Sequence, residues 1–217
     1  MAGATGVISG SAVTLTYTAF VIPGAGICTG SWARSLFTQD DGAKRDLSLD
    51  GWLSVATNPA HLGAAAAGVV PGLVGGTWGT DPISLRTADQ KANGAVTSIV
   101  CQREFQLPPE YVSGETVQIQ ARAGMVTTVA DTTATLDFEV KKLDADGDPT
   151  GSDLVTTAAE DINSLTLATK TFTINPSGLV AGDRFTVQMT LAIRDNATGT
   201  AVIGTAKNTE LLLDIKG

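Results

Sequence analysis

Hydrophobic and polar residues alternate most regularly between positions 183 and 196. Every second residue from Phe185 to Ile193 is apolar, and the residues between are threonine or glutamine, with Ala192 as the small exception. A period of two residues predicts a β-strand with one face in a core and the other face toward water. Because this is the longest clean alternation in the chain, we expect this strand to organise the sheet around it.

The same period recurs in shorter segments from Ala95 onward, separated by turn residues. We expect strands at 96–107, 115–123, 133–143, 154–157, 165–174, 183–196, 200–205 and 210–216. Two packed antiparallel sheets bury such one-sided strands, and about eight of them favour a jelly roll. The predicted fold class is therefore all-β. It is a jelly-roll-like antiparallel β-sandwich over residues 95–217, preceded over residues 1–94 by an N-terminal extended arm and an irregular loop region.

The first ninety-odd residues show a weaker pattern. Apolar residues alternate with threonine around Leu15, and a Pro-Gly break follows at Pro23. A terminal strand of this kind can pair with the edge of another sheet or of another chain. Residues 31–94 are rich in glycine and contain every tryptophan of the chain, which suits burial against a partner. We expect partner contacts, or else burial in the residues' own domain, at Val13, Leu15, Tyr17, Phe20, Trp32, Trp52 and Trp78.

Charge divides the chain in a similar way. The formal net charge is −8 over 217 residues, of which residues 1–94 carry −1 and residues 95–217 carry −7. The acidic balance and the lack of a basic patch argue against nucleic-acid binding. The longest apolar run is too short to cross a membrane. Cys28 and Cys101 are far apart, which favours two free thiols in a reducing cytoplasm, with a disulfide as the alternative.

No residue pattern predicts catalysis or a cofactor. His61 is the only histidine, and neither a nucleophile elbow nor a Cys-His pair accompanies it. Asp137 and Glu139 share the exposed face of one predicted strand, which is ordinary for a surface. The sequence therefore predicts a protein that is not an enzyme.

A weak calcium signal lies in an acidic turn. Its candidate ligands follow the spacing of a calcium loop only at the start, because the twelfth position is Val155 rather than glutamate. A solvated hairpin tip is the favoured interpretation, and calcium binding stays the alternative. The three candidates are Asp144, Asp146 and Asp148.

Several segments of the second part carry a family resemblance. They include LPPEYVSGETVQIQARAGM at 107–125, ADTTATLDFEVKKLDADG at 130–147 and SGLVAGDRFTVQMTLAIRDNATGTAVI at 177–203. These segments resemble small β-sandwich virion structural proteins of tailed bacteriophages, of the head decoration or cement type. The resemblance covers roughly the last half of the chain and implies no catalytic residues.

The resemblance implies a decoration or cement protein that binds the head shell through its N-terminal region and stabilises it. Its partners would be the major capsid protein and copies of itself, with a trimer expected. It would lie on the capsid surface of the virion after assembly in the host cytoplasm. The alternative is a tail- or fibre-associated carbohydrate- or receptor-binding module, with an exposed aromatic or acidic calcium site at one end of the sandwich. A glycan hydrolase is a third and disfavoured possibility.

Overall fold

The computed structural model describes the backbone over most of the chain. The described residues are 5–9, 12–22, 26–31, 43–63, 70–75, 79, 83–90, 95–109, 111–130, 133–195, 199–204 and 212–215. Side chains are described within these ranges from Leu47 to Thr200. Over the described residues no helix has the length and apolarity to span a membrane.

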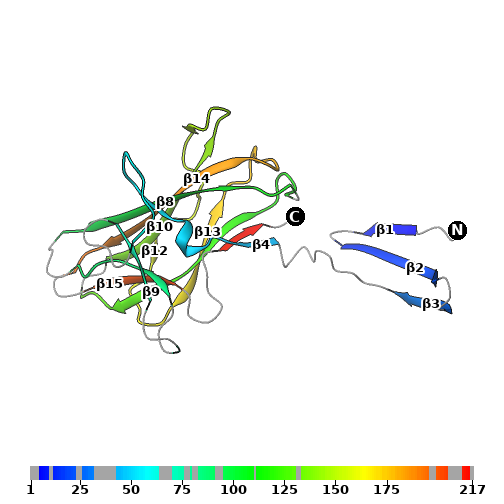
Figure 1. The fold of residues 1–217 in the computed structure, drawn as a ribbon, viewed down its shortest axis with the longest axis horizontal. Coiled ribbons are helices and arrows are strands. Elements are labelled where there is room, and N and C mark those ends of the chain that lie inside the picture. The colour runs from blue at the N-terminus through cyan, green and yellow to red at the C-terminus, as the bar shows by residue number, and fades with distance from the viewer. Residues whose placement is uncertain are drawn as a thin grey trace.

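The described strands form three antiparallel sheets, and two of them make up the sandwich (Figure 1). We call the first the β14 sheet, with strand order β11-β10-β14-β8-β5 and β12 also paired to β10. Its strands are β5 (Leu53–Ser54), β8 (Thr97–Gln106), β10 (Ala134–Leu143), β11 (Pro149–Thr150), β12 (Glu160–Asp161) and β14 (Arg184–Ile193).

The second, the β9 sheet, has the order β4-β16-β9-β15-β7-β6, with β13 also paired to β9. Its strands are β4 (Ala43–Asp46), β6 (Gly72–Val74), β7 (Ser84–Arg86), β9 (Val117–Thr127), β13 (Ala168–Ile174), β15 (Thr200–Gly204) and β16 (Leu212–Ile215). The third, the N-terminal sheet, joins β1 (Thr5–Ser9), β2 (Ala12–Ile22) and β3 (Gly26–Ser31).

The longer strands alternate between the two sheets of the sandwich. Along the chain β8, β10 and β14 belong to one sheet, while β9, β13 and β15 belong to the other and lie between or after them. The chain therefore crosses between the two sheets from β8 to β9, from β9 to β10 and from β13 to β14 to β15, and hairpins within one sheet join only short strands to a neighbour, as in β6–β7 and β10–β11. This connectivity, together with antiparallel pairing throughout, confirms the predicted jelly-roll-like β-sandwich.

The core lies between the two sheets and follows the predicted alternation. On β14 the residues from Phe185 to Ile193 are buried at every second position, as the sequence pattern predicts. Phe138 on β10 lies at the centre, 6.3 Å between ring centroids from Trp52 and 4.8 Å from Phe172 on the opposite sheet. Burial of these large side chains supplies the main force that holds the sheets together.

The sandwich begins earlier than the boundary predicted at Gly94. Strands β4, β5, β6 and β7 all precede that residue, yet each pairs within one of the two sandwich sheets. β5 pairs with β8, and β7 pairs with β15. The glycine-rich stretch hides these strands because each has only two to four residues and depends on a longer neighbour. Among the described strands, those outside the two sandwich sheets are β1, β2 and β3 of the N-terminal sheet.

Candidate functional site

A shallow polar groove lies on the outward face of the β14 sheet. The inward positions of β14 are apolar, as are most of those of β8 and β10, and polar residues stand at most of the outward positions between them. Strand register places Gln188 between Gln102 and Glu139, and Thr186 between Glu104 and Lys141. The groove has a volume of about 290 Å³ and is lined by Gln102, Glu139, Lys141, Pro149, Thr186 and Gln188.

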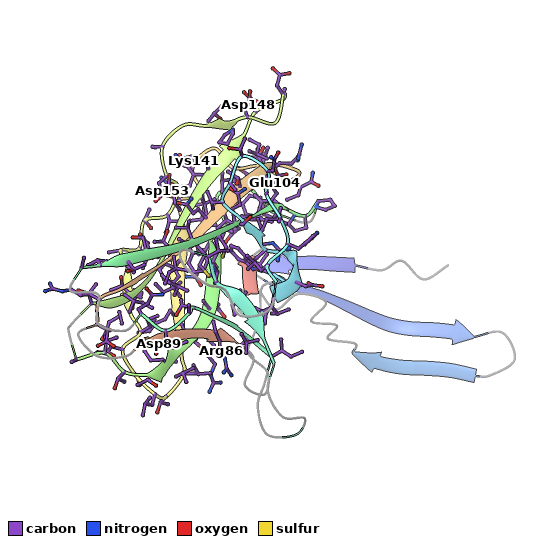
Figure 2. All side chains as sticks on the ribbon, turned by 60° about the vertical axis from the view of Figure 1, so that its left-hand side comes forward. Arg86, Asp89, Glu104, Lys141, Asp148 and Asp153 are labelled. Carbon is purple, nitrogen blue, oxygen red and sulfur yellow. The ribbon has the colours of Figure 1, made fainter. Side chains whose placement is uncertain are left out.

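One wall of the groove comes from the segment that follows β10. Pro149 pairs with Leu143 and belongs to the short edge strand β11. Beyond it, the Asp153 carboxylate accepts hydrogen bonds from the backbone N–H groups of Val140, at 2.8 Å, and Val155, at 3.0 Å. Lys141, Asp148 and Asp153 are seen together at this side of the molecule in Figure 2. The wall is therefore held to the sheet by backbone and side-chain hydrogen bonds.

Charges of both signs line the groove. Lys141 Nζ lies 2.7 Å from a Glu139 carboxylate oxygen, and this contact raises the pKa of Lys141. Burial, with smaller contributions from Asp153 and Glu139, raises the pKa of the Asp137 carboxyl against a lowering hydrogen bond from the Phe138 N–H. Arg184 and Glu104 form an ion pair of 2.9 Å on the neighbouring row.

These groups suit recognition by hydrogen bonding rather than group transfer. Glutamine side chains donate and accept, carboxylates accept, the ammonium donates, and a threonine hydroxyl does both. A volume of about 290 Å³ stands at the lower end of ordinary small-molecule sites. The acidic groups near the groove disfavour a strongly anionic ligand, so its chemistry fits a neutral molecule rich in hydroxyl groups.

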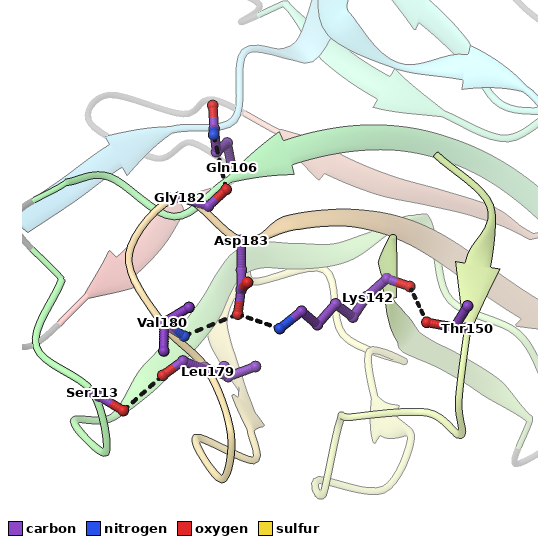
Figure 3. A network of polar contacts seen from close by, with 8 residues as sticks. All are labelled: Gln106, Ser113, Lys142, Thr150, Leu179, Val180, Gly182 and Asp183. Atoms are coloured by element: carbon purple, nitrogen blue, oxygen red, sulfur yellow. Dashed lines mark hydrogen bonds and ion pairs between the residues drawn. The ribbon is translucent and has the colours of Figure 1, made fainter. Parts of the chain in front are cut away.

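A second hollow, of about 550 Å³, lies at one end of the sandwich beside Gln106, Leu107, Pro108, Pro109, Ala181 and Gly182. Its polar groups already bond one another: Gln106 Nε2 donates to the Gly182 carbonyl at 2.9 Å (Figure 3). Asp183 accepts from the Val180 N–H at 2.9 Å and from Lys142 Nζ at 2.8 Å. Because these contacts hold the turn before β14 in place, we assign this region to stability rather than to ligand binding.

Trp52 is not available as a partner contact, contrary to the predicted role. Its side chain is fully buried in the sandwich core, packed against Phe138 and under the Arg103 guanidinium, whose carbon lies 5.9 Å from the ring centroid. The other reading of the sequence, burial in its own domain, holds here. Trp52 directly precedes strand β5, which pairs with β8 at the edge of the β14 sheet.

The remaining predicted partner contacts lie outside the described side chains. Trp32 and Trp78 are outside the described residues altogether. The backbone of the other four lies on β2, the central strand of the N-terminal sheet. These four are Val13, Leu15, Tyr17 and Phe20.

The acidic turn has a structural use. The Asp144 carboxylate accepts hydrogen bonds from the backbone N–H groups of Asp146, at 3.0 Å, and Asp148, at 2.9 Å. Gly147 has a φ of 91°, which a tight turn of this kind requires. Among the described residues no group of three acidic, histidine or cysteine side chains gathers to hold a metal ion. The favoured interpretation as a hairpin tip therefore agrees with the hydrogen bonding.

Two single residues complete the comparison with the sequence. His61 is exposed and forms an isolated bridge with Leu53. Cys101 is a free thiol, fully buried, and burial strongly raises its pKa. A buried thiol with a raised pKa is a poor nucleophile, so Cys101 acts as a small apolar core residue.

Sequence reasoning missed the groove residues. It placed Asp137 and Glu139 on an ordinary surface and did not single out Gln102 or Gln188. A usable signal was present, because bulky hydrogen-bonding side chains stand on the outward positions of β8 and β14 where smaller residues would also serve. What the sequence does not give is the order β10-β14-β8, which brings three distant segments side by side.

No family model and no curated protein sequence matches the chain. Among solved structures, it is similar to the CBM22-1 xylan-binding domain of Xyn10C from Paenibacillus barcinonensis, with 15% identity and a TM-score of 0.42 over 80% of this chain and 93% of that one. It is also similar to a structure described as "CBM4 structure and function", with 16% identity and a TM-score of 0.35 over 64% of this chain and 87% of that one. Likenesses at this level carry no argument about function.

Proposed function

We propose that the protein is a non-catalytic binding module whose sandwich takes a neutral carbohydrate in the groove of the β14 sheet. The observation that carries the proposal is the row formed by Gln102, Gln188 and Glu139, which three neighbouring strands hold in register. A rigid sheet positions such groups without a large loss of side-chain freedom on binding. Sugar hydroxyls are both donors and acceptors, and the row offers both kinds of partner.

Binding at this groove would rest on hydrogen bonds. The exposed large apolar residues of the described part are aliphatic, and the aromatic rings described there pack in the core. The stacking platform expected for the carbohydrate-binding alternative is therefore replaced by the polar row. Since a single net hydrogen bond contributes only about 0.5–1.5 kcal/mol, the affinity of one groove should be weak.

The test is a screen of the full chain against an array of neutral oligosaccharides, followed by titration calorimetry with the best one. Replacing Gln188→Ala should weaken binding by about 2- to 10-fold, the equivalent of one lost hydrogen bond. The matched control is Gln118→Ala on β9, whose side-chain amide lies 3.4 Å from the Thr173 hydroxyl in the other sheet. Binding lost equally in both variants, or no oligosaccharide bound at millimolar concentration, would refute the proposal.

A second proposed function follows from the N-terminal sheet and from the resemblance to phage virion proteins. A sheet separate from the sandwich sheets fits an arm that attaches a displayed domain to a capsid shell. In this reading the major capsid protein is the partner and the virion surface is the location. Counting copies per particle discriminates the two readings of the family. Hundreds at shell positions support decoration, and a handful at the tail support the carbohydrate- or receptor-binding role.

The arm can be tested on the same particles. Deleting residues 1–30 should leave a folded sandwich that no longer binds purified particles. Equal binding by the truncated chain would refute attachment through the arm.

A further inference from the structure

The N-terminal sheet contains an irregularity that sorts its residues between two faces. Along β2 the pairing with β3 runs from Tyr17 opposite Gly30 to Phe20 opposite Cys28, so β2 advances by three residues while β3 advances by two. The extra residue is a β-bulge, which shifts the alternation of β2 by one position. Tyr17 and Phe20 are therefore on the same face of the sheet, although their separation is odd.

The bulge gathers the apolar residues. Directly paired residues share a face, so Ile8 on β1 joins Val13, its partner on β2. Thr14, Thr16 and their partners Val7, Thr5 and Ser31 belong to the opposite face. Beyond the bulge this opposite face also holds the pair Val21–Ile27, and it has fewer large apolar residues than the first face. One face of the N-terminal sheet thus holds six large apolar residues, which we call the arm face: Ile8, Val13, Leu15, Tyr17, Phe20 and Ile22.

This face has no counterpart among the described strands. β1, β2 and β3 pair only with one another, and Figure 1 shows them to one side of the two sandwich sheets. A small isolated sheet with an apolar face is not stable in water without something packed on it. An occupant of the arm face is therefore required.

Charge identifies the occupant. Residues 1–33 contain no Asp, Glu, Lys, Arg or His, so the whole formal net charge of −8 belongs to residues 34–217. Two sandwiches repel each other, whereas two arm faces meet without any charge repulsion. A partner of opposite charge would be recognised by charged residues in the arm, and there are none. A second arm face is self-complementary, as a symmetric contact requires.

We propose that the N-terminal sheet is a self-association element, in which the arm faces of two copies pack against each other and hold the acidic sandwiches apart. β1, β2 and β3 have 5, 11 and 6 residues, so β1 and β3 each flank only about half of β2. At about 3.3 Å per residue and about 4.8 Å per strand the face covers about 350 Å², and a pair buries about 700 Å², which is the size of a weak and reversible interface. This inference is independent of any carbohydrate in the groove.

The experiment is sedimentation velocity on the full chain between about 5 and 500 μM, where an interface of this size dissociates. Leu15→Lys places a charge on the arm face and should weaken association by at least about tenfold. Thr16→Lys is the matched control, because it adds the same charge to the same strand on the opposite face. It should leave association unchanged, and raising the salt concentration should strengthen association in the parent chain by screening the sandwiches.

Cysteine chemistry gives a second readout. Cys28, opposite Phe20, is on the arm face by register, and the only other cysteine, Cys101, is buried in the core. A bifunctional maleimide should therefore link two copies through Cys28, and Cys28→Ser should abolish the linked species. Thr16→Lys should still be linked and Leu15→Lys should not.

Three results would overturn the proposal. One is a chain that stays monomeric over the whole concentration range, as it would if the arm bound only a capsid shell. Another is equal weakening by both lysine variants, and the third is association that falls steeply with salt. A monomeric chain that still binds an oligosaccharide would refute self-association and leave the proposed carbohydrate function standing.

Discussion

Trp52 offers the sharpest test of the sandwich, because the sequence leaves its role open between a partner contact and burial in its own domain, and the structure buries it. Its side chain is fully buried, and its indole Nε1 has no hydrogen-bond partner among the described residues. Two replacements separate its shape from its polar group. Trp52→Ala removes the whole ring from beside Phe138, and Trp52→Phe keeps most of the ring and removes only the N–H.

The expected magnitudes differ strongly. Trp52→Ala should lower the free energy of unfolding by about 3–5 kcal/mol, the usual loss for a large aromatic side chain in a core. Trp52→Phe exposes no new surface but buries about 40 Å² less, a loss of about 1 kcal/mol, with a similar loss for the small cavity. A weaker cation–π contact with Arg103, at 5.9 Å, removes up to about 1 kcal/mol more. Against these losses, removing a buried N–H without a partner returns about 1–3 kcal/mol.

The assay is urea denaturation followed by far-ultraviolet circular dichroism, which does not depend on tryptophan emission. We expect Trp52→Phe to lie within about 1 kcal/mol of the parent protein and Trp52→Ala to lie far below both. An alanine variant as stable as the parent would refute the placement of Trp52 in the core. A phenylalanine variant as unstable as the alanine variant would show instead that the indole N–H has a strong partner.

Three further predictions concern other parts of the sandwich. The pKa of Asp137 is higher in the native state than in the unfolded chain, so the charged carboxylate destabilises the native state and Asp137→Asn should raise the melting temperature at pH 7. The gain should disappear as the pH falls from the native pKa to the unfolded pKa, because the carboxyl is then protonated in both states. A gain that grows on acidification would contradict the raised pKa. In urea denaturation, Asp183→Ala should lower the free energy of unfolding by about 1–3 kcal/mol and Lys142→Ala by less than about 1 kcal/mol. The effects differ because the Asp183 side chain is 11% exposed whereas that of Lys142 is 39% exposed. Equal effects of the two variants would contradict the assignment of Asp183 to holding the turn before β14. Gly124→Ala should destabilise the folded protein by about 1–3 kcal/mol, because an added Cβ would lie 2.8 Å from the Ser164 carbonyl oxygen. A melting temperature equal to that of the parent protein would show that the loop containing Ser164 moves away.

The strand β14 shows how far a hydrophobic pattern reaches. Its alternation predicted both the strand and its buried face, because a strand covered on one side must repeat every two residues. The short strands β11 and β12 were not predicted, since each has two residues and is defined by its pairing with β10. A strand of two residues is too short to show a hydrophobic alternation, so it can be recognised only by its pairing with a neighbouring strand.

The groove and the arm face could not be predicted from the sequence, for two different reasons. Gln102 and Gln188 stand 86 positions apart and become neighbours only through the order of strands in the sheet. Strand order depends on how the chain crosses between the two sheets, and that choice is made by the packing of the whole core. Phe20 was predicted to contact a partner together with Tyr17, but strict alternation would put them on opposite faces, and the bulge between them is visible only in the pairing.

The charge boundary also gains a physical meaning from the fold. A boundary at Gly94 divides the chain into an almost neutral part and an acidic part, but strands β4 to β7 of the almost neutral part belong to the sandwich. A boundary directly before Arg34 divides the chain into a first part without charged side chains, which contains the N-terminal sheet, and a second part that carries the whole net charge. A groove that binds through a few hydrogen bonds needs several copies acting together to hold a surface, because linked weak sites gain avidity without any new contact. In the self-association that we propose, the uncharged apolar arm would supply that linkage, and repulsion between the acidic sandwiches would keep them apart and leave their grooves open.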